Sequence, residues 1–302
     1  MPLTDPAFFK QLDRLRVQIR AARGHRPGET PIPRSSQAWG IEFEAYKEYA
    51  PGDDFRYLDW NAVGRLDQLV VKRFTAEREI SFHLFLDTSA SMGAPAIDQK
   101  FVFASDLAAA LSYVVLTNNN TLRLIALSSP EKNHRPFLAT PFLRHRSAFQ
   151  RVQPFLATLV PAGRTYLRET LRAYVEQTKE PGVAVVISDF LTGPSQYEEA
   201  LGFLRARGYE VEALQVLGAA ELSPERLFRR GKLYDVEDQS ERWISLTPAN
   251  LRRYQEVLQA HLDGLQQFCH RQHILYARIS TASSLVTLVT EELTQAGLLA
   301  LR

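Results

Sequence analysis

Carboxyl and hydroxyl side chains follow a predicted buried strand near residue 80, and their types suit a hard metal ion. The apolar run 80–86 is typical of a buried strand. It leads directly into Asp87, Ser89 and Ser91. One carboxylate and two hydroxyls at alternate positions bring three oxygen donors to a single turn, and oxygen is the donor that Mg²⁺ prefers.

Two later segments can complete the same cluster. Thr165 precedes a helix-forming segment, and the apolar run 183–188 predicts a second buried strand, which leads into Asp189. In an open parallel sheet, ligands bind outside the carboxyl ends of the strands where the strand order reverses. We therefore expect one metal site formed by Asp87, Ser89, Ser91, Thr165 and Asp189. The alternative is that the three hydroxyls only cap helices or stabilise turns.

The order of these motifs resembles a known fold. D-x-S-x-S, then G-x-T-x-L, then a strand ending in Ser-Asp are similar to the metal-ion-dependent adhesion site of the von Willebrand factor type A fold. The resemblance implies Mg²⁺, or another divalent cation such as Mn²⁺ or Ca²⁺, with an open coordination position for an Asp or Glu carboxylate of a protein partner. Phe190 follows Asp189 where many type A domains have glycine, and we expect it to narrow the approach to the ion.

A second resemblance covers more of the chain. The segments 40–43, 49–60 and 72–77 look like the hallmark of the bacterial family catalogued as domain of unknown function fifty-eight. Members carry a type A domain directly after such a segment, and their genes commonly lie beside one for a MoxR-type AAA+ ATPase. The resemblance therefore implies that ATPase, or its client, as a partner.

The hallmark segment contains five residues that suit either a structural or a docking role: Asp53, Asp54, Arg56, Asp59 and Trp60. In the structural interpretation, Arg56 pairs with Asp54 or Asp59 in a tight turn while Trp60 packs against the main domain. In the other, the segment is a docking surface beside the metal. The family resemblance implies no role for these residues.

The hydrophobic pattern predicts two parts, residues 1–79 and 80–302. The first holds an amphipathic helix with Phe8, Leu12, Leu15 and Ile19 on its apolar face, then a small β-rich extension. The second alternates strands and helices, which is typical of a doubly wound α/β fold of the Rossmann-like kind with a mostly parallel sheet. It ends in a hairpin over 233–246, a helix opening at Thr247-Pro248, a strand over 273–279 and a closing helix over 283–299.

Composition excludes several classes of protein. The chain has 302 residues, of which 45% are hydrophobic, so it can bury a substantial core. A net charge of +2 does not support nucleic-acid binding as the main function. We expect no transmembrane segment, because no apolar run approaches the roughly 20 residues that a span needs. Residues 1–10 lack the order of a secretory signal, so we expect a cytoplasmic protein with Cys269 packed in the interior.

Enzyme signatures are weaker than the adhesion motif. A haloacid dehalogenase-type phosphatase needs a second Asp two residues after the first, and position 89 is Ser. The common nucleotide, serine-hydrolase and zinc motifs are absent. Asp98 and Glu169 are the nearest candidate bases in sequence, and each is more simply a charge in the first turns of a helix. We expect an adaptor and no enzyme; the alternatives are a magnesium-dependent hydrolase and a scaffold with an unoccupied site.

Overall fold

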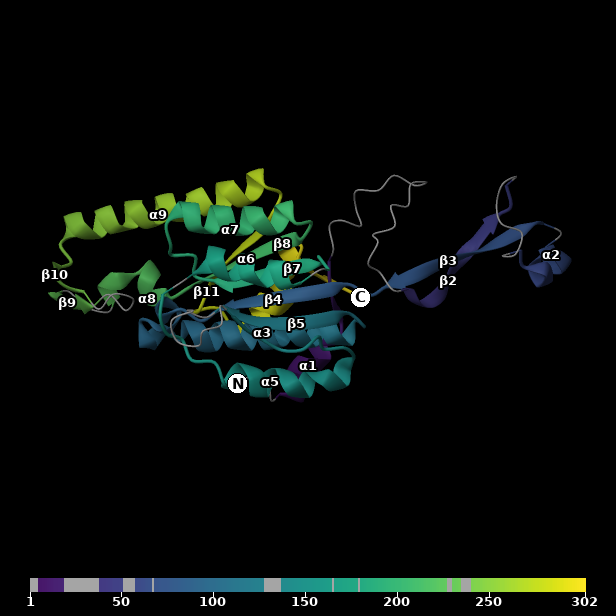
Figure 1. Ribbon diagram of the computed structural model, residues 1–302, viewed down its shortest axis with the longest axis horizontal. Helices are drawn as coiled ribbons and strands as arrows, with labels where there is room; N and C mark the ends of the chain where they lie inside the picture. The colour runs from purple at the N-terminus through teal and green to yellow at the C-terminus, as the bar shows by residue number, and fades with distance from the viewer. Residues whose placement is uncertain are drawn as a thin grey trace. The chain divides into compact units, whose positions relative to one another are not determined.

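A computed structural model describes residues 5–18, 38–50, 58–66, 68–127, 137–164, 166–178, 180–226, 230–234 and 240–302. The chain divides into two compact units (Figure 1). Residues 1–29 and 81–302 form the main unit, and residues 30–80 form the smaller unit. This division differs from the expected one, residues 1–79 and 80–302, in that the N-terminal helix belongs to the unit that contains the sheet.

The main unit is built on a six-stranded sheet in the order β11-β8-β7-β4-β5-β6. Neighbouring strands are parallel except β5 and β6, which are antiparallel. The bounds are β4 (Ser81–Asp87), β5 (Thr121–Leu127), β6 (Phe137–Ala139), β7 (Val183–Ser188), β8 (Glu210–Leu217) and β11 (Leu275–Ser280). The central strands are buried on both faces, which explains their continuous apolar sequences. The predicted doubly wound α/β class is confirmed.

Helices cover both faces of this sheet (Figure 1). One layer contains α3 (Lys100–Thr117) and α5 (Val152–Ala157); the other contains α6 (Leu167–Gln177), α7 (Pro194–Ala206) and α9 (Pro248–Arg271). Under the second layer, Phe85 and Val186 of the sheet share a buried core with Leu171 and Leu201 of the helices. Contrary to the expectation that no apolar run is long enough, the segment 96–117 alone in the described part of the chain has the length and composition to cross a membrane. In this fold, 67% of its apolar window is buried.

The N-terminal helix is shorter than the apolar periodicity predicts. Helix α1 (Pro6–Leu12) is capped by Asp5, whose Oδ1 accepts a hydrogen bond from Ala7 N at 2.8 Å. Leu15 lies instead on β1 (Leu15–Val17), which pairs antiparallel with β12 (Leu299–Leu301). Phe8, Leu12 and Leu15 are all buried, and Ile19 lies outside the described residues. Burial of these side chains in the main unit is why residues before 30 belong to it.

The C-terminal region confirms most of the predicted elements. The hairpin consists of β9 (Arg230–Tyr234) and β10 (Glu241–Ser245). Thr247 caps α9, because its Oγ1 accepts a hydrogen bond from Asn250 N at 3.2 Å. The expected closing helix is instead α10 (Leu285–Thr287), a π-helical turn η8 (Leu288–Glu292) and α11 (Leu293–Gln295). Gly297, at φ 81°, then turns the chain into β12.

The smaller unit pairs β2 (Ala38–Glu48) with the antiparallel β3 (Val70–Arg78), as the sequence predicts. Between them lies an unpredicted short helix, α2 (Trp60–Leu66). Asp59 Oδ1 accepts a hydrogen bond from Asn61 N at 3.0 Å and so caps this helix. The Trp60 side chain is 71% exposed, and its expected packing against the main domain stays a prediction. Asp53, Asp54 and Arg56 lie outside the described residues.

Candidate metal centre

The predicted site lies where the strand order of the sheet reverses. From β4 the chain continues outward through β5 and β6, and from β7 it continues in the opposite direction through β8 and β11. Asp87 is the last residue of β4, and Asp189 directly follows β7. Both carboxylates are about 1% exposed. They therefore occupy the position at which doubly wound folds bind ligands.

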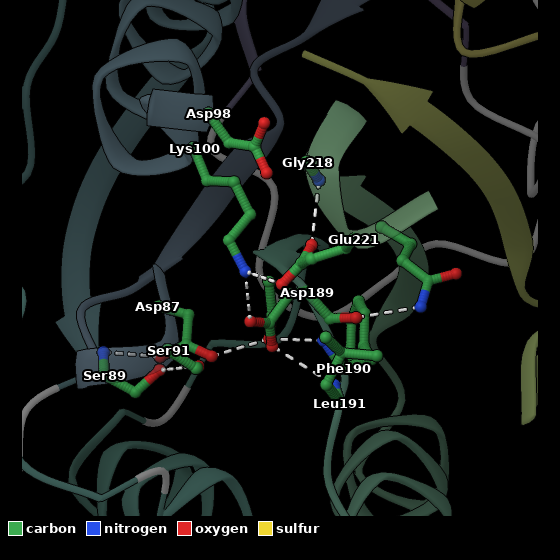
Figure 2. A network of polar contacts seen from close by, with 12 residues as sticks. Asp87, Ser89, Ser91, Asp98, Lys100, Asp189, Phe190, Leu191, Gly218 and Glu221 are labelled. Atoms are coloured by element: carbon green, nitrogen blue, oxygen red, sulfur yellow. Dashed lines mark hydrogen bonds and ion pairs between the residues drawn. The ribbon is translucent and has the colours of Figure 1, made fainter. Parts of the chain in front are cut away.

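The hydroxyls of the first motif lie close together beside Asp87 (Figure 2). Ser89 Oγ is 3.0 Å from Ser91 Oγ. Asp87 Oδ1 accepts a hydrogen bond from Ser89 N at 2.9 Å, and its Oδ2 accepts one from Ser188 Oγ at 2.6 Å. Ser89 precedes the short 3₁₀ helix η4 (Ala90–Gly93), but its side chain makes no capping hydrogen bond. The Ser89 side chain therefore does not act as a helix cap.

The loop before the second motif is bonded to this turn. Ala90 N donates to Gly163 O at 2.9 Å, and Ala162 N donates to Thr88 O at 2.9 Å. Thr165 itself lies outside the described residues, so its expected place in the site stays a prediction.

A buried lysine that the sequence analysis missed contacts Asp189. Lys100 Nζ donates to Asp189 Oδ2 at 3.0 Å and to Glu221 Oε1 at 2.5 Å (Figure 2). Asp189 Oδ1 accepts a hydrogen bond from Leu191 N at 3.1 Å. No motif marks Lys100 or Glu221 in the sequence, because a lysine opening a helix and a glutamate in a short loop helix are ordinary surface residues in most proteins.

The buried charges shift one another's pKa values. Burial raises the pKa of Asp87 to about 6, and repulsion from Asp189 adds to this rise, while hydrogen bonds from Ser188 and Ser89 oppose it. Burial lowers the pKa of Lys100, but the carboxylates of Asp189 and Glu221 outweigh burial, and the pKa is raised overall. Burial raises the pKa of Glu221 although Lys100 opposes this. A raised pKa favours the charged form of Lys100 but the neutral form of Glu221, so the two shifts disagree about this ion pair. We favour a charged Lys100, because two carboxylates face its ammonium group.

Phe190 does not narrow the approach to the site. Its backbone adopts φ 51°, a left-handed conformation that glycine adopts without strain. Its ring is fully buried in the hydrophobic core, and its carbonyl accepts a hydrogen bond from His261 Nε2 at 2.8 Å. The expectation of a narrowed approach is wrong, because this backbone conformation turns the ring into the core.

The donor set fits a hard divalent cation. Asp87, Ser89, Ser91 and Asp189 offer only oxygen atoms, which suit Mg²⁺ or Ca²⁺. The carboxylates of Asp87 and Asp189 lie at adjacent strand ends and repel each other, and this repulsion contributes to the raised pKa of Asp87. In the described part of the chain, no group of three or more His, Cys, Asp and Glu side chains could hold a metal. A metal at this place would thus depend on the serine hydroxyls.

The two candidate bases are engaged by other groups. Asp98, in the 3₁₀ helix η5 (Ala96–Asp98), is 9% exposed and accepts hydrogen bonds from Ala220 N at 3.0 and 3.1 Å. Glu169 is exposed and pairs with Arg168 at 2.7 Å.

The fold is therefore that of an α/β protein with carboxylates and hydroxyls at its switch point. The chain belongs to the family described as "Protein of unknown function DUF58", which matches residues 45–262. The family that the hallmark segments predicted is thereby confirmed, although segment 40–43 lies outside the matched residues. Uncharacterized proteins of Mycobacterium bovis and Mycobacterium tuberculosis are each 30% identical over 227 residues, covering 71% of this chain and 67% of the relative.

Solved structures show weaker likeness. The conserved hypothetical protein BatB of Bacteroides thetaiotaomicron is 15% identical with a TM-score of 0.44, covering 72% of this chain and 98% of that one. The manganese-loaded TRAP protein of Plasmodium vivax is 17% identical with a TM-score of 0.31, covering 47% of this chain and 58% of that one.

Proposed function

We propose that this protein is a metal-dependent adaptor that binds another protein through Mg²⁺ at the candidate metal centre. The observation that supports it is the convergence of Asp87, Ser89, Ser91 and Asp189 at the adjacent ends of β4 and β7. With Thr165, these residues would hold the ion directly or through water. Neutral hydroxyl ligands leave the ion electron-poor, so it favours a carboxylate from outside the chain.

The loops around this centre carry exposed apolar side chains. Ile97 is 72% exposed, Val160 is 74% exposed, and Leu191 is 39% exposed. Ile97 follows the turn that contains Ser91, and Val160 precedes the loop that is hydrogen-bonded to Thr88. Leu191 lies two residues after Asp189. A metal site whose loops carry exposed apolar side chains suits a protein surface that presents Asp or Glu among apolar residues.

The proposed partner is a MoxR-type AAA+ ATPase or its client, and the proposed role is in assembly or maturation of other proteins in the cytoplasm. The link to the ATPase rests on the family resemblance alone.

Affinity capture from cell extract tests the adaptor. The full chain is used as bait in about 5 mM MgCl₂ and, separately, in about 5 mM chelator; this concentration lies above the dissociation constants of the weakest extracellular Ca²⁺ sites. We expect magnesium-dependent capture that Ser89→Ala and Thr165→Ala both weaken. Ser147→Ala, an exposed serine in η6 (Arg146–Arg151), is the matched control and should capture normally. Capture of the same partner in equal amount with chelator and with either substitution would support a scaffold with an unoccupied site.

The hydrolase alternative is tested on the same purified protein. The adaptor predicts no magnesium-dependent turnover of phosphate esters or nucleotides, because both candidate bases are hydrogen-bonded elsewhere. Turnover that disappears in Asp98→Asn or Glu169→Gln would overturn the adaptor and favour the enzyme.

A further inference from the structure

Lys100 is a buried cation whose position is unusual for a lysine. It is the first residue of α3, and its side chain is 0% exposed. Burying an ammonium group is unfavourable unless carboxylates pair with it. The N-terminal end of a helix also carries partial positive charge, which disfavours a cation there. The two ion pairs, with Asp189 and Glu221, are what hold Lys100 in this place.

The second carboxylate is itself held in position by backbone groups (Figure 2). Glu221, in α8 (Ala219–Leu222), accepts a hydrogen bond through Oε2 from Gly218 N at 2.8 Å. Asp98 accepts from Ala220 N. Gly218 lies so close to Asp98 that a Cβ atom there would sit 2.0 Å from Asp98 Oδ2. The start of α8 is thus fixed against the start of α3, with the Lys100 ammonium between Glu221 and Asp189.

The contacts of Asp189 have a direct consequence for metal binding. Its Oδ2 is already paired with a positive charge, and its Oδ1 accepts a backbone hydrogen bond. A divalent cation that uses Asp189 must share that carboxylate with the ammonium group or displace it. Like charges held close together in a buried site repel strongly, because little water screens them. Lys100 and the metal therefore oppose each other.

We propose that Lys100 is a resident counter-cation that competes with the divalent metal for Asp189 and so sets the metal affinity of the site. Lys100 holds Asp189 when no metal is bound, so the centre is assembled before the ion arrives. This inference rests on the proposed function only in placing a metal at this centre.

Calorimetric titration of the full chain with MnCl₂ and with MgCl₂ tests this role. Lys100→Met keeps most of the length of the side chain and removes its charge. We expect Lys100→Met to bind both ions at least ~10-fold more tightly than the unaltered chain, since one unit charge beside a divalent ion is removed. Lys232→Met is the matched control: Lys232 pairs with Glu241 at 2.8 Å on the exposed hairpin, and its loss should leave both dissociation constants unchanged.

A purely structural role for Lys100 gives a different result. It predicts that Lys100→Met lowers the melting temperature in chelator while the dissociation constants stay the same or rise, and that result overturns the inference. If Lys100→Met does not fold in chelator, Lys100→Gln, which retains a hydrogen-bond donor, replaces it in the titration.

The two proposals fail in distinguishable ways. Metal binding by the unaltered chain without tightening in Lys100→Met contradicts the counter-cation alone. Binding only after the lysine is replaced supports the counter-cation and contradicts metal use by the unaltered protein. No binding by either protein contradicts both.

Discussion

Magnesium should stabilise this protein, and Asp87→Ala should abolish that response. A ligand present at 100 times its dissociation constant stabilises the folded state by about 2.7 kcal/mol. For a chain of 302 residues, about 1 kcal/mol shifts the melting temperature by about 2 °C. We therefore expect saturating MgCl₂ to raise the melting temperature by about 5 °C, because the ion relieves the repulsion between Asp87 and Asp189.

The substitution also changes stability without metal, and the two effects are separable. Alanine removes the acceptor of the hydrogen bonds from Ser89 N and Ser188 Oγ. Each donor left without a partner in a buried place costs about 1–3 kcal/mol, and the lost repulsion from Asp189 offsets part of this. The melting temperature in chelator should thus fall by several degrees, about 2 °C per kcal/mol, with no further change on adding magnesium.

Differential scanning fluorimetry in chelator and in MgCl₂ measures both quantities. Glu176→Ala removes an exposed carboxylate that pairs with Arg172, and it should keep the full magnesium response. The same magnesium shift in Asp87→Ala as in the unaltered chain would refute the reasoning and place the ion elsewhere.

Three further perturbations probe the surrounding fold. Burial lowers the pKa of His83 to about 3, and Arg123 adds to this effect. Lowering the pH from 7 to 5 therefore protonates His83 in the unfolded chain but not in the folded one, which should lower the free energy of unfolding by about 2 kcal/mol. His83→Phe, measured by urea unfolding, should flatten this dependence, and an unchanged slope would contradict it. Gly218→Ala should lower the melting temperature by displacing Asp98, and an unchanged value would show that α8 can move freely. Burial raises the pKa of Cys269 to about 12, so iodoacetamide should label it only after unfolding; rapid labelling of the native protein would show that the thiol is exposed.

Several elements were predictable because one physical rule dominates them. The run Val183–Ser188 is buried on both faces, so its nearly continuous apolar sequence, rich in Val and Ile, identifies the strand. Thr247-Pro248 opens α9 because an N-cap followed by proline suits only a helix start. The N-terminal helix was predicted too long, since Leu15 fits a helical face and a strand equally well, and pairing of β1 with β12 decided between them.

The sequence by itself determined the fold class, the family and the pair of carboxylates with their neighbouring serines, because each depends on residue types at short spacing. Only the tertiary structure decided which distant charges meet: Lys100 and Glu221 are 121 positions apart, and no local pattern connects them. It also decided that the Phe190 ring enters the core, through a backbone conformation that residue type alone does not specify. The physical reason is that desolvation and charge pairing depend on what surrounds a group in space, whereas periodicity and motifs record only what lies beside it in the chain.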